Sequence, residues 1–232
     1  MLDSLIHFDQ QLLLSLNGSD SVYWDGVWMC ITTVGTWILF FLALFVVLMR
    51  NNDIRNLLLI IAMLGLAILL ADQGASGICK PLCHRFRPTH EPLLDGLVDV
   101  VDGYRGGLYG FMSSHAANGF AICTFLSLVI RYRWVTCTLF TYASLSSFSR
   151  IYLGVHYPGD ILCGAIWGVI CAFLVHSLYR YIQRRNGMSR SFMSDAYTTT
   201  GFLKDDAHLV PLAFSISLVY VLFYALFYSL HH

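Results

Sequence analysis

The sequence predicts an all-α polytopic membrane protein, a bundle of about six transmembrane helices with an N-terminal helix lying in the membrane interface. Of its 232 residues, 57% are apolar and only 12% are charged, which is far from the balance of soluble proteins. Apolar runs of about twenty residues recur between polar or Gly- and Pro-bearing breaks, and such runs can cross a bilayer as helices. We expect one domain over residues 1–232, with a motif core at 80–160.

Six apolar runs are assigned as membrane spans. They cover residues 27–49, 57–78, 116–130, 134–152, 161–182 and 209–230, of which the third and fourth are shorter or more polar than the others. Ahead of them, the apolar residues of segment 1–17 recur at helical spacing, which favours a helix in the interface. This segment lacks the basic start of a cleavable signal peptide and carries Asp3 and Asp9 instead.

The distribution of Lys and Arg predicts the orientation of the bundle. Six spans put five of these residues on one face, and three of those five lie in the motifs described below. The other face has nine, Arg50, Arg55, Arg131, Arg133, Arg180, Arg184, Arg185, Arg190 and Lys204. Positive charge collects on the cytoplasmic side. We therefore expect a bacterial cytoplasmic membrane protein whose motif-bearing face opens to the periplasm or exterior.

Several other classes of protein and site are disfavoured. A formal net charge of zero, without a basic tract, argues against a nucleic-acid partner. Cys79 and Cys83 are interpreted as free thiols, although a bond between them was an alternative. His84, His90 and Glu91 form no strong metal-ligand pattern, so neither a metal nor a cofactor is expected. The oligomeric state is left open.

Three segments return to the motif-bearing face with cationic or imidazole side chains. The first contains Lys80 and Arg87, each followed directly by a proline. A lysine point charge and a planar arginine fork suit the oxygens of a phosphate. Alternatively, both side chains simply reach for headgroups from the end of the second span.

The second segment places Ser113, Ser114 and His115 where the third span begins. Serine caps helices well, and uncommitted backbone N–H groups at a helix N-terminus form an anion site. An ordinary N-cap beside an interfacial histidine is the alternative.

The third segment carries Arg150, His156 and Asp160 between the fourth and fifth spans. Pro158 suits the first turn of a helix, so Asp160 should lie about one turn beyond His156. The carboxylate can then fix one imidazole nitrogen and leave the other free as a nucleophile.

Taken together, the three segments resemble the type 2 phosphatidic acid phosphatases, whose signature reads K-x6-R-P, then P-S-G-H, then S-R-x5-H-x3-D. The first and third blocks match at every specified position. The middle block departs, because Met112 replaces proline and Ser114 replaces glycine, whereas Ser113 and His115 are retained. The resemblance is specific from Lys80 to Asp160.

The resemblance implies a metal-independent mechanism. His156 would attack phosphorus, Asp160 would orient it, and His115 would protonate the leaving oxygen and then activate water. The phosphoryl oxygens would be stabilised by Lys80, Arg87, Ser113, the backbone amide of Ser114, and Arg150. Three cations can supply the charge that Mg²⁺ supplies elsewhere.

The expected substrate is a phosphomonoester or diphosphate on a membrane lipid, with undecaprenyl diphosphate as the first choice. Lipid A, phosphatidylglycerophosphate and phosphatidate are the alternatives, and transfer to an acceptor other than water stays open. A vanadate-dependent haloperoxidase shares the signature, but six spans speak against it. A transporter is disfavoured because the polar groups gather at one face and not at the midplane.

The polar pair Asp72 and Gln73 and the 93–108 loop each allow two interpretations. Asp72 and Gln73 could anchor a motif cation or be simple polar residues at a helix end. The 93–108 loop could be a lid or lipid entrance, or an inert surface loop.

Overall fold

The computed structural model describes residues 2–187 and 194–231, and Arg190 of the orientation argument lies outside them. The described residues form helices and loops with two isolated β-bridges, Phe86 with Tyr109 and Tyr197 with Leu203. The α-helices are α1 Leu2–Leu16, α2 Val22–Thr32, α3 Ile38–Asn51, α4 Ile54–Asp72, α5 Lys80–Cys83, α6 Ser114–Ile130, α7 Arg133–Tyr152, α8 Pro158–Arg185, α9 Lys204–Ala207 and α10 Leu209–Ser229. A π-helical stretch, Gln73–Cys79, joins α4 to α5, and 3-10 turns lie at Val34–Trp37, Pro88–His90, Pro92–Leu94 and Val101–Gly103.

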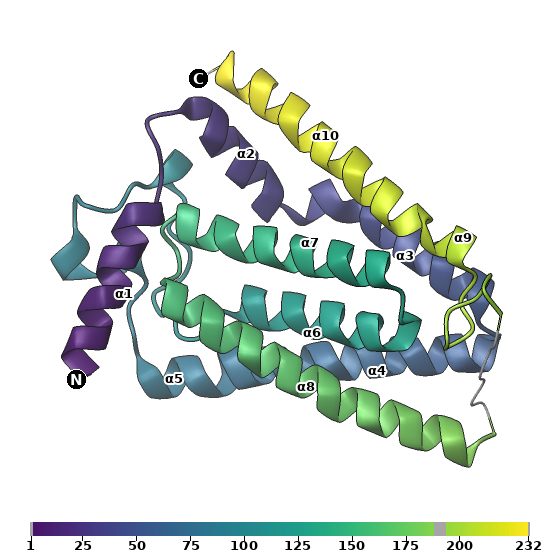
Figure 1. Cartoon of the computed structure of the whole chain (residues 1–232). Coiled ribbons are helices and arrows are strands. Elements are labelled where there is room, and N and C mark those ends of the chain that lie inside the picture. Colours follow the sequence, from purple (N-terminus) through teal and green to yellow (C-terminus); the bar gives the residue numbers. More distant parts are fainter. Residues whose placement is uncertain (1, 188–193, 232) are drawn as a thin grey trace.

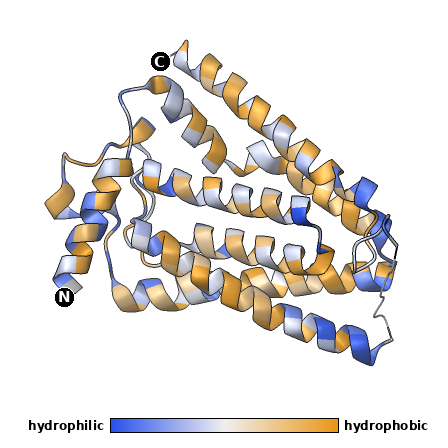
Figure 2. Cartoon of the chain, viewed as in Figure 1, coloured by the Kyte–Doolittle hydropathy of each residue, from blue (hydrophilic) through white to orange (hydrophobic). Residues whose placement is uncertain are grey.

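The expected all-helical membrane bundle is confirmed. Four helical stretches of the described chain are long and apolar enough to cross a bilayer, at Val34–Asn51, Ile54–Cys83, Pro158–Arg185 and Lys204–Ser229. Shorter or more polar, α6 and α7 lie alongside them (Figure 1). Figure 2 shows that the long helices are mostly hydrophobic and that hydrophilic residues gather toward the ends of the bundle. Helix α1, which the sequence predicts to lie in the interface, crosses one end of the bundle (Figure 1).

The first expected span differs from the sequence prediction, since α2 and α3 are separate helices. Thr33 between them has an extended backbone (φ −81°, ψ 124°). Backbone groups freed by such a break need other partners inside a membrane. The Thr36 hydroxyl donates to the Cys30 carbonyl at 2.6 Å, and the Trp37 indole N–H donates to the Ile31 carbonyl at 2.9 Å. The break is thus held by its own downstream side chains.

Close packing of α6 against α8 fixes the end of the bundle that carries the motifs. Gly164 and Gly168 lie one turn apart on α8, where a Cβ would fall 2.4 Å from the Ser113 carbonyl oxygen and 2.2 Å from that of Ala117. Small residues at this spacing let two helix backbones approach closely. In the same region the Ser113 N–H donates to the Asp160 carbonyl at 3.1 Å. The start of α6 is therefore held against the start of α8.

Candidate active site

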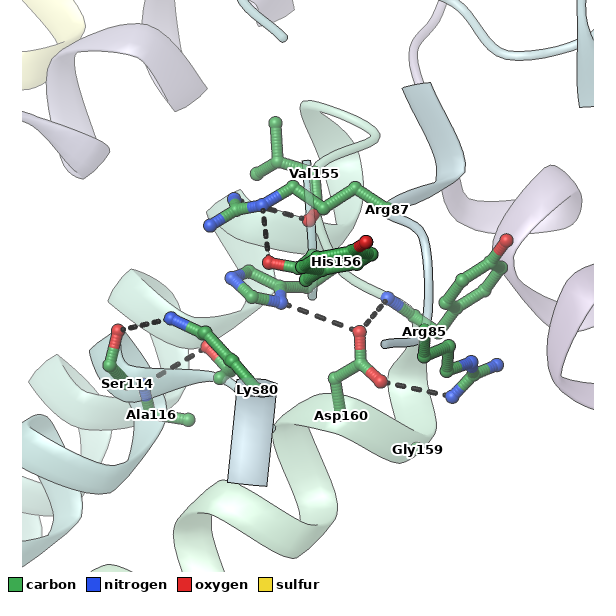
Figure 3. A network of polar contacts seen from close by, with 12 residues as sticks. Lys80, Arg85, Arg87, Ser114, Ala116, Val155, His156, Gly159 and Asp160 are labelled. Carbon is green, nitrogen blue, oxygen red and sulfur yellow. Dashed lines mark hydrogen bonds and ion pairs between the residues drawn. The ribbon is translucent and has the colours of Figure 1, made fainter. Parts of the chain in front are cut away.

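The His156 and Asp160 pair adopts the arrangement expected from the sequence. Asp160 lies in the first turn of α8, and His156 lies in the loop just before it. Asp160 Oδ2 is 3.4 Å from His156 Nδ1 and accepts a second hydrogen bond from the Tyr157 N–H at 3.1 Å (Figure 3). The first distance is at the long end for a hydrogen bond, as catalytic contacts often are without substrate. With Nδ1 facing the carboxylate, Nε2 is the nitrogen left to react.

The His156 side chain is almost fully buried, at 1% exposure. Burial, followed by the positive charges of Arg87, Arg150 and Lys80, lowers the pKa of this imidazole well below its ordinary value. Both effects disfavour the imidazolium form. The free enzyme therefore presents a neutral imidazole at neutral pH, which is the form a nucleophile requires.

Three motif cations surround this histidine, and the described hydrogen bonds of each go to neutral oxygens. Lys80 Nζ donates to the hydroxyls of Ser76 at 3.3 Å and Ser114 at 3.2 Å. Arg87 donates to the carbonyls of Tyr109 at 3.2 Å and Val155 at 3.4 Å. Figure 3 shows Lys80 and Arg87 on two sides of the imidazole.

The third cation, Arg150, is held by two hydroxyls. Its guanidinium donates to Thr32 at 2.7 Å and to Tyr104 at 2.8 Å. Its Nε is buried without a hydrogen-bond partner among the described residues, and a buried unpaired donor is costly. Within the described ranges, none of the three cations forms an ion pair with a carboxylate. Their positive charge is therefore available to an anion.

The middle block completes the cluster. Ser113 is fully buried and caps α6, its hydroxyl accepting from the Ala116 N–H at 3.4 Å. Ser114 begins the helix, and its hydroxyl contacts the motif lysine. His115 follows on the first turn, where part of its side chain is exposed. Partial desolvation of the ring, followed by nearby positive charge, that of Arg150 first, lowers the pKa of this imidazole to about 4. All eight residues singled out from the sequence thus come from segments that meet at one end of the bundle.

Asp72 reaches the motif lysine through an intermediary. Its Oδ1 accepts from the Ser76 hydroxyl at 3.4 Å, and Ser76 Oγ in turn accepts from Lys80 Nζ. The three residues recur at four-residue spacing, one each on α4, the π-helical stretch and α5. Of the two interpretations left open for Asp72, the structure favours anchoring a motif cation.

Four residues near the site were not assigned to it from the sequence. Tyr104 belongs to the 93–108 loop and holds Arg150, so this loop is not inert. Thr32, the last residue of α2, accepts a hydrogen bond from the same arginine. Arg85 and Asp9 form ion pairs beside Asp160. Each contact joins segments distant in sequence, so no spacing pattern revealed it.

An apolar cavity of about 740 Å³ lies beside the cluster, between α1 and α8. Its lining includes Leu5, Phe8 and Leu12 of α1, Phe111, and Leu162 of α8. Pro158 and Gly159, which come directly after the His156 loop, also line it. A space that is apolar along most of its wall and that reaches the segment directly after His156 suits the acyl chain of a lipid whose headgroup lies at the site.

The described residues contain no group of three or more His, Cys, Asp or Glu side chains that could hold a metal ion. Metal independence stays a prediction. Cys79 and Cys83 are free thiols, as expected.

Residues 56–184 match the family model described as the PAP2 superfamily, and this segment contains all three motif blocks. The chain belongs to the PAP2 superfamily. The match confirms the family resemblance inferred from the motif spacing. As a PAP2 protein with apolar helices, it is a multi-pass membrane enzyme, a phosphatase that acts on a lipid.

Two curated relatives of this PAP2 protein are named lipid A 4′-phosphatase. The one from Bacteroides thetaiotaomicron is 36% identical over 189 residues, covering 79% of this chain and 84% of the relative. The one from Porphyromonas gingivalis is 34% identical over 184 residues, covering 79% and 78%.

Two solved structures are similar in fold. The crystal structure of Aquifex aeolicus LpxE has a TM-score of 0.56 and 25% identity, covering 72% of this chain and 93% of that one. A transmembrane PAP2-type phosphatidylglycerolphosphate phosphatase from Bacillus subtilis has a TM-score of 0.56 and 19% identity, covering 79% and 88%. The second likeness concerns the fold alone.

Proposed function

We propose that this PAP2 protein hydrolyses the 4′-phosphate of lipid A, through a phosphohistidine intermediate and without a metal ion. One observation carries the phosphate site: three cations, each hydrogen-bonded to neutral oxygens, surround a buried neutral imidazole. The choice of lipid rests on the names of the two curated relatives. Those names favour lipid A over undecaprenyl diphosphate, which the sequence placed first.

In the first step, His156 Nε2 attacks phosphorus. The new N–P bond forms as the bond from phosphorus to the sugar oxygen breaks, and His115 gives its proton to that oxygen. The negative charge of the bound phosphate raises the pKa of His115 from its lowered value, so that the ring carries this proton when substrate is present. Asp160 holds Nδ1–H and stabilises the positive charge that develops on the ring. Lys80, Arg87 and Arg150 stabilise the charge on the three equatorial oxygens, and the buried Nε of Arg150 gains a partner.

In the second step, His115 takes a proton from water, and the water oxygen attacks phosphorus. The N–P bond breaks, so His156 returns to its neutral form and inorganic phosphate leaves. The exposed side chain of His115 suits a residue that exchanges protons with solvent. Ser113 and the Ser114 backbone amide assist at the N-terminus of α6, where N–H groups favour an anion.

The apolar cavity supports a lipid substrate, because an acyl chain can lie between α1 and α8 while its headgroup approaches the cations. The arrangement of Lys and Arg supports a site on the periplasmic side of the cytoplasmic membrane. Substrate could then be taken from the outer leaflet.

The decisive experiment is a phosphate-release panel on purified protein in detergent and excess EDTA. It compares lipid A, undecaprenyl diphosphate, phosphatidylglycerophosphate and phosphatidate, with His156→Ala as the blank. We expect lipid A to give the highest kcat/KM. Faster turnover of another lipid would reject the substrate choice. Full activity of His156→Ala, or loss of activity in EDTA that added metal restores, would reject the mechanism.

A further inference from the structure

Arg85 differs from the three motif cations because carboxylates occupy both sides of its guanidinium. One nitrogen lies 2.9 Å from Asp160 Oδ1, and the other lies 2.8 Å from Asp9 Oδ2. Figure 3 shows Arg85 beside Asp160, on the opposite side of the carboxylate from the His156 imidazole. Arg85 falls at an unspecified position of the K-x6-R-P block. Its charge is thus committed to the protein instead of to an incoming phosphate.

Asp9 of α1 makes a second contact with the same segment. Its Oδ1 accepts a hydrogen bond from the Gly159 backbone N–H at 2.8 Å. The Arg85 guanidinium also lies over the Tyr157 ring, 4.0 Å from its centroid. Asp9 and Arg85 together therefore hold Tyr157, Gly159 and Asp160, the segment that connects the nucleophilic histidine to α8.

The helix that carries Asp9 is itself anchored. Leu13 is fully buried in a cluster with Ile151 and Tyr157. At the end of α1, the Asn17 side-chain amide donates to the Tyr152 carbonyl at 2.7 Å. The interfacial helix is therefore fixed to the ends of α7 and α8, which gives Asp9 a defined position relative to Asp160.

We propose that Asp9 and Arg85 are positioning residues for His156 and that α1 is thereby a working part of the active site. This inference rests on the proposed function. Asp160 is fully buried, and a buried carboxylate without an opposite charge is strongly unfavourable. Arg85 supplies that charge, and Asp9 fixes the direction from which it approaches. Asp160 then keeps the orientation that aligns the histidine.

The test compares Asp9→Asn, Arg85→Lys and Arg85→Gln with the parent, and uses Asp3→Asn as a matched control. Asp3 lies on the same helix and is exposed. Turnover is measured on dispersed lipid A and on soluble p-nitrophenyl phosphate, together with inhibition by inorganic phosphate and the melting temperature in detergent. Measuring both substrates separates chemistry from capture of the lipid.

We expect Asp9→Asn to lower kcat about tenfold to hundredfold on both substrates, because small misplacements of a reacting group are costly. The inhibition constant for phosphate should stay within about twofold of the parent, since ground-state binding of the anion is retained. Arg85→Lys should retain more activity than Arg85→Gln. The losses of Asp9→Asn and Arg85→Gln should be non-additive when combined, as expected for residues acting as one unit.

An Asp9→Asn protein that is folded and has the parent kcat would overturn the inference. A rise in KM for lipid A without a change in kcat would also overturn it, because α1 would then be a membrane anchor only. So would a loss of phosphate inhibition in Arg85→Gln that parallels its loss of activity, because Arg85 would then be a phosphate ligand. These outcomes leave His156→Ala inactive, whereas failure of the proposed function would leave it active.

Discussion

The backbone N–H of Ser113 donates to the carbonyl oxygen of Asp160 at 3.1 Å. This bond ties the residue that caps α6 to the residue that holds the proposed nucleophile, across 47 positions of sequence. The spacing between the proposed phosphate-binding end of α6 and His156 is thereby set by the backbone. It depends on the close approach of α6 and α8 at Gly164 and Gly168.

Replacing Gly164 by alanine should destabilise the bundle by about 1–3 kcal/mol, because the new Cβ overlaps the Ser113 carbonyl and overpacking forces helices apart. The rate of phosphate release should fall by more than the loss of folded protein explains, since the same shift breaks the hydrogen bond between Ser113 and Asp160. Melting temperature in detergent and phosphate release would be measured together. Gly65→Ala is the control, because a Cβ there meets nothing within 4 Å. Equal behaviour of the two variants would contradict this account of the packing.

Ser114→Gly restores the glycine of the family signature and removes the hydroxyl that accepts from Lys80. Losing one such bond costs about 0.5–1.5 kcal/mol, so we expect weaker phosphate inhibition by less than about tenfold. Ser76→Ala, which removes the other hydroxyl partner of Lys80, should have a similar effect. Lys80→Met should weaken phosphate inhibition far more than either of these variants. Loss of all activity in Ser114→Gly would mean that the hydroxyl itself takes part in the chemistry.

Removing the charge of Arg87 should raise the pKa of His156. Burial lowers that pKa first, and the charge of Arg87 lowers it further by repelling the imidazolium. In Arg87→Met the repulsion is gone, so His156 should take up its proton at higher pH than in the parent. Titration of the labelled histidine rings by NMR in detergent micelles would measure this shift. Arg105→Met, an exposed change at the same end of the bundle, is the comparison, and an unchanged or lower pKa in Arg87→Met would contradict the assignment.

Leu162→Trp should fill part of the cavity between α1 and α8. Turnover of a long-chain lipid phosphate should fall, and that of p-nitrophenyl phosphate should be kept. Ile166→Trp changes an exposed residue one turn further along α8 that does not line the cavity. Equal losses on both substrates, or equal losses in both variants, would argue against a chain-binding role for this space.

Membrane orientation can be tested by labelling introduced cysteines. In a background with Cys83→Ser and Cys137→Ser, which removes the two exposed native thiols, a membrane-impermeant reagent should label Asp95→Cys in intact cells. Ser194→Cys should be labelled only after the membrane is opened. The reverse pattern would place the active site in the cytoplasm.

The sequence predicts the site better than the bundle around it. Fixed short spacings determine that Asp160 reaches His156, because a helical turn brings residues four apart together. The break at Thr33 was missed because the run 27–49 is uncharged and mostly apolar, and hydropathy does not report backbone angles. The local signal for it is the cluster of Thr32, Thr33, Gly35 and Thr36 inside the run. Contacts such as Arg150 with Thr32 and Tyr104, or Arg85 with Asp9, join segments that pack only in the folded bundle. No local pattern encodes them.

The chain of contacts from Asp72 through Ser76 to Lys80 affects how an anion is received. A lysine joined directly to a carboxylate would have to give up an ion pair on each catalytic cycle. Here the countercharge stands one hydroxyl away. In the proposed mechanism, an arriving phosphate therefore exchanges only neutral contacts, which reform once it departs. The acid keeps the ammonium group in place between turnovers without competing for it, and this favours rapid release of product as much as capture of substrate.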